Sequence, residues 1–202
     1  GEGPGFHYIT NFEQLLPSEL IARAMANTAQ LHALPIEVKL ECEMDTAPAR
    51  AGVGYLQQQN MKLPARDLPN HNACFIIKRE EGPRNVTLES NPWPRSVAEG
   101  KVREGAARAA FDGFQFKQTV LEAVGAFETL AMSMLPLYAE ALGLGQEYFT
   151  KAFTSPLVRF RLSHYPQTPA GEFGINPHID TSFFTLLATT DSTGLVVYSH
   201  AR

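Results

Sequence analysis

The sequence predicts an α+β fold in which a mainly helical N-terminal half packs against a β-sandwich or jelly roll. The chain has 202 residues, of which 44% are hydrophobic, and this is enough for one domain with a substantial core. Helical spacing of apolar residues dominates the first part, whereas β-rich runs separated by Pro, Gly, Asp and Thr turns follow Ser155. We therefore expect a single domain over residues 1–202, with a mainly helical part (1–154) and the first strands of the β core in 155–202.

The N-terminal half alternates short strands with helices. Residues 6–10 read as a strand, and a helix follows in which Pro17 suits the first turn and Leu34-Pro35 ends the apolar periodicity. A second short helix is expected at 36–42, and strands at 54–56 and 74–78. The remainder of 45–72 and all of 80–95 are expected to be loop.

A long helix is predicted from about Gln115 to Leu142. Its apolar face recurs at steps of three and four residues, and Asp112 is a plausible cap. Pro136 should kink or interrupt it, and Gly143 and Gly145 should end it. The strands predicted after it are 157–165, 182–189 and 195–198.

Composition excludes several classes of function. The net charge is −4 without clustered Lys and Arg, so we expect no nucleic-acid partner. Apolar runs such as 183–188 are far too short to span a membrane. Cys42 and Cys74 match neither a disulfide framework nor a zinc motif and are expected to be reduced and structural. No signal peptide opens the chain, and a cytoplasmic location is expected. We also expect a monomer or a weak homo-oligomer.

The strongest chemical signal is His178-Ile179-Asp180, which follows Pro177 and precedes an apolar run. On an extended segment, residues two apart point to the same face with Cα atoms roughly 6.6 Å apart. An imidazole nitrogen and a carboxylate oxygen at that separation can converge on one metal ion. Two nitrogens and one carboxylate form the facial triad of non-heme Fe(II) oxygenases, although a His/Asp pair also binds Zn or Mn. A plain turn histidine followed by a capping aspartate is the structural alternative.

The strand that precedes this pair carries a second candidate group. Arg159, Arg161, Ser163 and Tyr165 share one face by alternation. Such a face can bind a carboxylate through charge-assisted hydrogen bonds, or it can simply be a solvated strand surface.

Several motifs occur together in one order along the chain. They are Gly5-Phe6-His7-Tyr8-Ile9, Leu34-Pro35-Ile36-Glu37-Val38-Lys39, Asn70-His71-Asn72-Ala73-Cys74-Phe75, Asn91-Pro92-Trp93-Pro94, Ala141-Leu142-Gly143-Leu144, Tyr165-Pro166 and His178-x-Asp180 followed by Phe-Thr-Leu-Leu. Together they resemble the isopenicillin N synthase-like family of iron(II)- and 2-oxoglutarate-dependent dioxygenases.

This resemblance implies a double-stranded β-helix (jelly roll) core, Fe(II) and 2-oxoglutarate as cofactors, and O2 as co-substrate. His178 and Asp180 would be metal ligands, and Tyr165, together with Ser163, would hold the distal carboxylate of 2-oxoglutarate. The reaction would oxidise an unactivated C–H bond of a small molecule by hydroxylation, desaturation or cyclisation, and would release succinate. Arg159, Arg161, Phe75 and Tyr8 are the candidates for substrate contact.

The chain also departs from the family pattern. The family's distal histidine lies several tens of residues beyond its His-x-Asp, followed by an Arg-x-Ser pair, and neither occurs before Arg202. His200 is the only later histidine and stands at the wrong spacing. We expect the third ligand, and the rest of the jelly roll, in sequence after Arg202. The alternatives are an iron oxidase of the same fold that does not use 2-oxoglutarate, and a non-catalytic binding module that lacks the third ligand.

Overall fold

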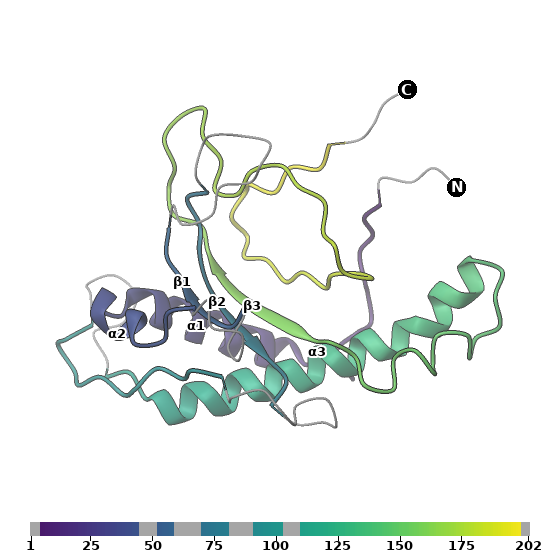
Figure 1. The fold of residues 1–202 in the computed structure, drawn as a ribbon, viewed down its shortest axis with the longest axis horizontal. Helices are drawn as coiled ribbons and strands as arrows, with labels where there is room; N and C mark the ends of the chain where they lie inside the picture. Colours follow the sequence, from purple (N-terminus) through teal and green to yellow (C-terminus); the bar gives the residue numbers. More distant parts are fainter. Residues whose placement is uncertain (1–4, 45–51, 59–69, 81–90, 103–109, 199–202) are drawn as a thin grey trace.

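The computed structural model describes residues 5–44, 52–58, 70–80, 91–102 and 110–198. Within these ranges the chain forms three helices and three strands (Figure 1). The helices are α1 (Ser18–Ala33), α2 (Ile36–Leu40) and α3 (Gly113–Ala141), and the strands are β1 (Gly54–Leu56), β2 (Ala73–Lys78) and β3 (Arg159–His164). The prediction of helices combined with β-strands is confirmed, and each of these elements lies where the sequence placed it, to within about two residues.

The sheet has the order β1-β2-β3, and both pairs are antiparallel. Phe75 is opposite Tyr55 on one side and Leu162 on the other, so these three residues share a face. Cys74 is opposite Ser163, which places both on the other face. Helix α1 contacts both α3 and β3, and the chain after β3 curves back beside the sheet (Figure 1). One face of the sheet therefore belongs to the core, and the other faces the segment that carries His178.

Helix α3 begins and ends with the capping interactions that its sequence predicts. The Asp112 carboxylate accepts hydrogen bonds from the main-chain N–H groups of Phe114 and Gln115 at 2.9 and 3.1 Å. At the other end, Gly143 has a positive φ of 71°. The N–H of Leu144 then bonds to the carbonyl of Ala139 at 2.8 Å, which forms a Schellman motif.

The helix continues through Pro136, so it is not interrupted there, and the kink that was the other expectation stays a prediction. Proline removes one hydrogen bond, to the carbonyl four residues earlier. The neighbours Met134, Leu135 and Ala139 are all buried, and their packing holds the helix across the missing bond.

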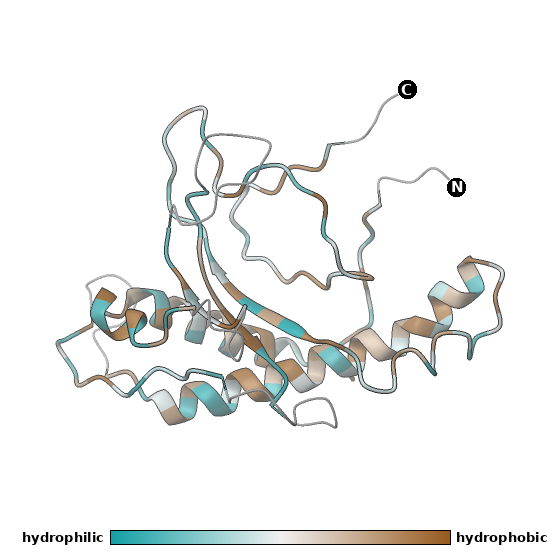
Figure 2. Ribbon diagram, in the orientation of Figure 1, coloured by the Kyte–Doolittle hydropathy of each residue, from teal (hydrophilic) through white to brown (hydrophobic). Residues whose placement is uncertain are grey.

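The core centres on an aromatic group formed by Phe75, Trp93, Phe111 and Phe116. Their ring centroids lie 5.4 to 6.2 Å apart in tilted or edge-on arrangements. A second apolar cluster joins α1 to the middle of α3 through Leu20, Ala123 and Leu130, among others. Hydrophobic residues accordingly mark β2 and α3 in Figure 2. Cys42 and Cys74 are both buried, and they form no disulfide with each other.

By length and composition alone, α3 is apolar enough to cross a membrane. Its buried residues, however, pack against α1 and the sheet. Only 33% of its most apolar stretch is buried in the described structure, so these contacts account for the apolar residues of the buried face alone.

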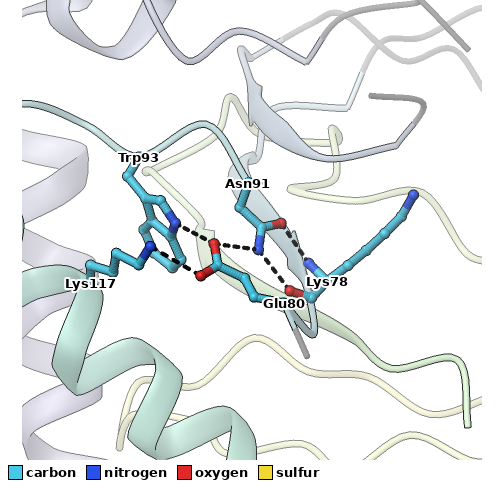
Figure 3. Close-up of polar contacts among 5 residues, drawn as sticks. All are labelled: Lys78, Glu80, Asn91, Trp93 and Lys117. Carbon is cyan, nitrogen blue, oxygen red and sulfur yellow. Dashed lines mark hydrogen bonds and ion pairs between the residues drawn. The ribbon is translucent and has the colours of Figure 1, made fainter. Parts of the chain in front are cut away.

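A polar network fixes the end of β2 to the start of α3 (Figure 3). The Glu80 carboxylate accepts hydrogen bonds from Trp93 Nε1 at 2.6 Å and Asn91 Nδ2 at 3.3 Å, and it pairs with Lys117 Nζ at 3.0 Å. Asn91 also bonds to both main-chain polar groups of Lys78. Burial raises the pKa of Glu80, but the hydrogen bonds and the Lys117 charge together outweigh it and leave the pKa lowered. The network therefore stabilises the ionised carboxylate.

His32 links α1 to β3 and is held neutral. Its Nε2 is 3.0 Å from the carbonyl of Leu162, and its ring stacks on His164 with centroids 5.1 Å apart. Its Nδ1 is buried with no hydrogen-bond partner among the described residues. Burial lowers the pKa of His32 from 6.5 to about 4, and the nearby His164 and Lys39 act in the same direction.

This environment predicts a pH-dependent stability. Between about pH 4 and pH 6.5, the unfolded chain binds a proton on His32 that the native chain does not. The free energy of unfolding should therefore fall as the pH is lowered from 6.5, by about 2 kcal/mol at pH ~5. His32→Gln should remove that part of the pH dependence in urea denaturation, whereas His7→Gln, at an exposed position, should not. Equal pH slopes for His32→Gln and wild type would contradict this assignment.

Three predicted strands are not formed. Residues 6–10, 182–189 and 195–198 are extended or bent, without a ladder. A strand needs a neighbour for its N–H and C=O groups, and no described residue pairs with these segments. The described part of the chain therefore has a three-stranded antiparallel sheet rather than a complete jelly roll. The loops predicted in 45–72 and 80–95 fall largely outside the described residues.

Candidate metal centre

The structure brings the donor atoms of His178 and Asp180 together. His178 Nε2 lies 3.4 Å from Asp180 Oδ1, and the two side chains are 36% and 54% exposed. Two ligands at right angles on a metal ion, each ~2.1 Å away, would be roughly 3 Å apart. The pair therefore fits two adjacent positions on one metal ion with little rearrangement.

The remaining polar atoms of this pair already have partners. His178 Nδ1 is 2.8 Å from the main-chain oxygen of Asn176, and Thr185 Oγ1 donates to Asp180 Oδ2 at 2.6 Å. Metal-binding histidines and carboxylates typically use their second polar atom in this way, which fixes the ring orientation and the tautomer. Nε2 and Oδ1 are left facing each other. The donor set thus agrees with the predicted metal site.

The loop that carries His178 is pinned to the start of β2. Asn70 and Asn176 are each 3% exposed, and Asn70 Oδ1 accepts hydrogen bonds from both nitrogens of Asn176. The N–H of Asn72 donates to the carbonyl of Gly174 at 2.8 Å. His71 Nε2 contacts the Glu172 carboxylate and so joins the same two segments. These contacts hold a segment without regular secondary structure in a defined position.

The predicted carboxylate-binding face lies on β3. Leu162 is buried in the core, whereas Arg161 and Ser163 alternate to the opposite face. Arg161 Nη2 lies 3.7 Å from Cys74 Sγ across the ladder, and this is the face toward which Cys74 also points. The alternation predicted for Arg159, Arg161 and Ser163 is thus present in the structure.

Tyr165 follows β3 and interacts electrostatically with both Arg161 and Asp180. Its side chain is 54% exposed, and Gly174 packs so closely on its ring that a Cβ at Gly174 would lie 2.8 Å from Tyr165 Cδ1. Partial burial raises the pKa of Tyr165; the Arg161 charge and a hydrogen bond with Ser163 oppose this rise, and the Asp180 charge adds to it. These electrostatic influences come from Arg161 and Ser163 on β3 and from Asp180, so the four residues share one local environment.

Three of the residues predicted to contact substrate do not gather around one site. Phe75 is 0% exposed, in the aromatic core on the opposite face of the sheet. Tyr8 is 99% exposed, so no described residue covers its ring. The Arg159 guanidinium lies against Gly52, where a Cβ would be 2.9 Å from Arg159 Nη1. The structure therefore supports no common substrate pocket formed by these three residues.

No group of three or more metal-ligating side chains occurs among the described residues. The third ligand expected after Arg202 stays a prediction, and His200 lies outside the described part of the chain. Four residues that support the site were missed from sequence: Asn70, Gly174, Asn176 and Thr185. Of these four, Asn176 could have been proposed from the sequence, because it lies two residues before His178 and its main-chain carbonyl can reach the imidazole.

Comparison with known proteins finds relatives in sequence but no matching family model. No protein-family model matches the chain. It is 27% identical to the 2-oxoglutarate-Fe(II) type oxidoreductase hxnY of Emericella nidulans over 205 residues, covering 96% of this chain and 54% of that protein. A protein of Dictyostelium discoideum named as a probable iron/ascorbate oxidoreductase is 28% identical over 107 residues, which are 44% of this chain and 30% of that protein.

Solved structures share the fold. JOX2 in complex with 2OG, Fe and JA matches with a TM-score of 0.60 and 16% identity, over 83% of this chain and 43% of that chain. The C-terminal truncated T7H of Neurospora crassa, in apo form, matches with a TM-score of 0.51 and 24% identity, over 77% of this chain and 50% of that chain. The chain is similar to 2-oxoglutarate-Fe(II) oxygenases in sequence and in fold.

The family resemblance read from the sequence motifs is thus confirmed. The chain spans about half of the oxidoreductase hxnY and less than a third of the Dictyostelium relative. The region matched to hxnY covers the described helices, the sheet and the segment with the His178/Asp180 pair, because 96% of this chain aligns with that protein.

Proposed function

We propose that the protein is an Fe(II)- and 2-oxoglutarate-dependent dioxygenase that oxidises an unactivated C–H bond of a small molecule and releases succinate. The observation that carries the proposal is the 3.4 Å approach of His178 Nε2 and Asp180 Oδ1, with their outer atoms already hydrogen-bonded. The jelly-roll core, completed by sequence after Arg202 that would also supply the third ligand, is part of the proposal.

Each residue has a distinct task in this proposal. His178 and Asp180 would hold the metal, with Asn176 and Thr185 keeping them oriented. Tyr165, with Ser163 beside it, would donate a hydrogen bond to the distal carboxylate of 2-oxoglutarate, and the Arg161 charge would favour an anion there. Bound iron and 2-oxoglutarate would supply the oxidising chemistry, and the protein would orient the substrate and exclude water.

The proposed reaction is tested by measuring succinate in the full-length protein. Succinate formation should require Fe(II), 2-oxoglutarate and O2 together, and Zn(II) or Mn(II) should not replace iron. Turnover that proceeds without 2-oxoglutarate would favour the iron oxidase of the same fold, an alternative to which the similarity to an iron/ascorbate oxidoreductase gives some support. Absence of any iron-dependent oxidation, together with absence of metal binding, would favour the non-catalytic binding module.

Tyr165→Phe should weaken 2-oxoglutarate binding and leave metal binding unchanged. A hydrogen bond to a charged group contributes about 1.5–3 kcal/mol, so the dissociation constant should rise roughly 10- to 100-fold. The measurement is calorimetric titration of 2-oxoglutarate into the Mn(II)-loaded full-length protein. Tyr148→Phe, at a 62% exposed position outside the site, is the control. An unchanged 2-oxoglutarate affinity in Tyr165→Phe would remove this residue from the site.

A further inference from the structure

We propose that Tyr138 is a positioning residue for the metal ligand Asp180. It acts through residues 183–185, because Thr185 is hydrogen-bonded to that ligand. The inference rests on the proposed function, since the position of the carboxylate matters for activity only if Asp180 binds a metal. Tyr138 lies near the C-terminal end of α3, and its ring belongs to a cluster that takes no direct part in the proposed reaction.

This aromatic cluster joins the segment after Asp180 to α3. Its members are Tyr138, Phe149, Phe153, Phe183 and Phe184. The Tyr138 ring stacks on Phe184 with centroids 5.1 Å apart and planes 19° apart, and it meets Phe183 edge-on at 5.9 Å. Phe149 and Phe153 meet the same Phe183 ring edge-on at 5.0 and 5.1 Å. Aromatic pairs in such arrangements attract each other beyond the effect of the area they bury. The cluster therefore ties residues 183–184 to the helix.

Side-chain packing, rather than a β-ladder, holds this segment in place. Residues 182–189 form no strand with the described part of the chain. Phe184 and Leu186 are partly buried, Phe184 on the Tyr138 ring and Leu186 against the second apolar cluster, which joins α1 to α3. Alternate side chains of an extended segment point to opposite sides, so Thr185 points away from this packed side. Thr185 is indeed exposed.

Thr185 passes this position on to the metal ligand. Its Oγ1 donates to Asp180 Oδ2 at 2.6 Å, while Asp180 Oδ1 lies 3.4 Å from His178 Nε2. A hydrogen bond to one oxygen limits the rotation of the carboxylate and keeps the other oxygen directed at the metal position. Without the Tyr138 ring, Phe184 would lose the surface on which it stacks, and residues 183–186 could shift along α3. Thr185 would then no longer hold the carboxylate in its orientation.

The test compares the Mn(II) affinity of variants of the full-length protein. Tyr138→Ala should raise the dissociation constant for Mn(II) by about 10-fold or more, as loss of a group that orients a metal ligand typically does. Tyr138→Phe keeps the ring and should bind Mn(II) like wild type. Thr185→Ala should raise the constant by a similar factor. Tyr138→Ala added to Thr185→Ala should have little further effect, because the ring acts through that hydroxyl.

A second measurement follows Thr185 itself, in metal-free protein labelled with carbon-13 in the threonine methyl groups. Thr185→Ser removes the methyl group and so identifies its signal in the NMR spectrum. That signal should move in Tyr138→Ala and stay in place in Tyr138→Phe. Tyr148→Ala is the matched control, because Tyr148 is 62% exposed and meets the cluster at Phe149, with centroids 5.1 Å apart. It should leave the signal and the Mn(II) affinity unchanged even if it lowers the free energy of unfolding.

Wild-type Mn(II) affinity in either Tyr138→Ala or Thr185→Ala would overturn the proposal. Thr185 is exposed, so Thr185→Ala should fold whether or not Tyr138→Ala does. An unmoved Thr185 signal in Tyr138→Ala would overturn the proposal as well. A wild-type protein that fails to bind Mn(II) would instead contradict the proposed function, while the Thr185 signal would still decide whether Tyr138 positions the residue that contacts Asp180.

Discussion

His178→Ala and Asp180→Asn should each lower iron-dependent succinate formation by more than about 100-fold. Loss of a residue that merely supports a metal ligand typically costs 10- to 100-fold, so loss of the ligand itself should cost more. Both side chains are well exposed, and their donor atoms Nε2 and Oδ1 face each other rather than the core. The fold should therefore survive either change, with an unfolding midpoint in urea close to that of wild type.

The control for this pair is Asp191→Asn, which changes an exposed carboxylate further along the same segment. It should leave succinate formation unchanged. The measurement compares initial rates of succinate release and the affinity for Fe(II) in all three variants of the full-length protein. Wild-type rates in either His178→Ala or Asp180→Asn would refute the assignment of the metal ligands.

Phe75→Ala should lower the free energy of unfolding by about 3–5 kcal/mol. The Phe75 ring is 0% exposed and lies 6.1 Å from Trp93 and 6.2 Å from Phe116 between ring centroids. Removing it would leave a cavity between the sheet and α3 that these rigid neighbours cannot fill. Urea denaturation measures the change directly.

Phe114→Ala is the matched control, because Phe114 is a phenylalanine of the first turn of α3 that is 70% exposed. It should change the free energy of unfolding by less than about 0.5 kcal/mol. The same pair of variants tests the earlier idea that Phe75 contacts substrate. A Phe75→Ala protein with wild-type stability and a selectively raised KM would return Phe75 to the substrate site and contradict its place in the core.

Local signals in the sequence were sufficient for most of the described elements. Asp112 and Gly143 mark the ends of α3 because capping depends on residues within a few positions of each helix end. The apolar run at Cys74–Lys78 predicted β2, which is buried on both faces. The alternation of Arg161, Leu162 and Ser163 likewise predicted the two faces of β3.

Features that depend on distant partners could not be predicted in this way. Residues 182–189 have strong β propensity, but they form no strand without an adjacent edge among the described residues. Asn70 and Asn176 meet only because β2 and the loop after β3 are brought together by the fold. The His178/Asp180 pair was predicted because its two members are neighbours in sequence, whereas the residues that orient it were not.

The most direct test of the metal site is an anaerobic titration of the full-length protein, including any sequence after Arg202, with Fe(II) and then 2-oxoglutarate. If His178 and Asp180 hold iron beside a site for 2-oxoglutarate, the second addition should produce a weak visible charge-transfer band. The band should be lost in Asp180→Asn and kept in Asp191→Asn. A clean titration of folded wild-type protein that shows no band would contradict the proposal that this chain carries an Fe(II)/2-oxoglutarate centre.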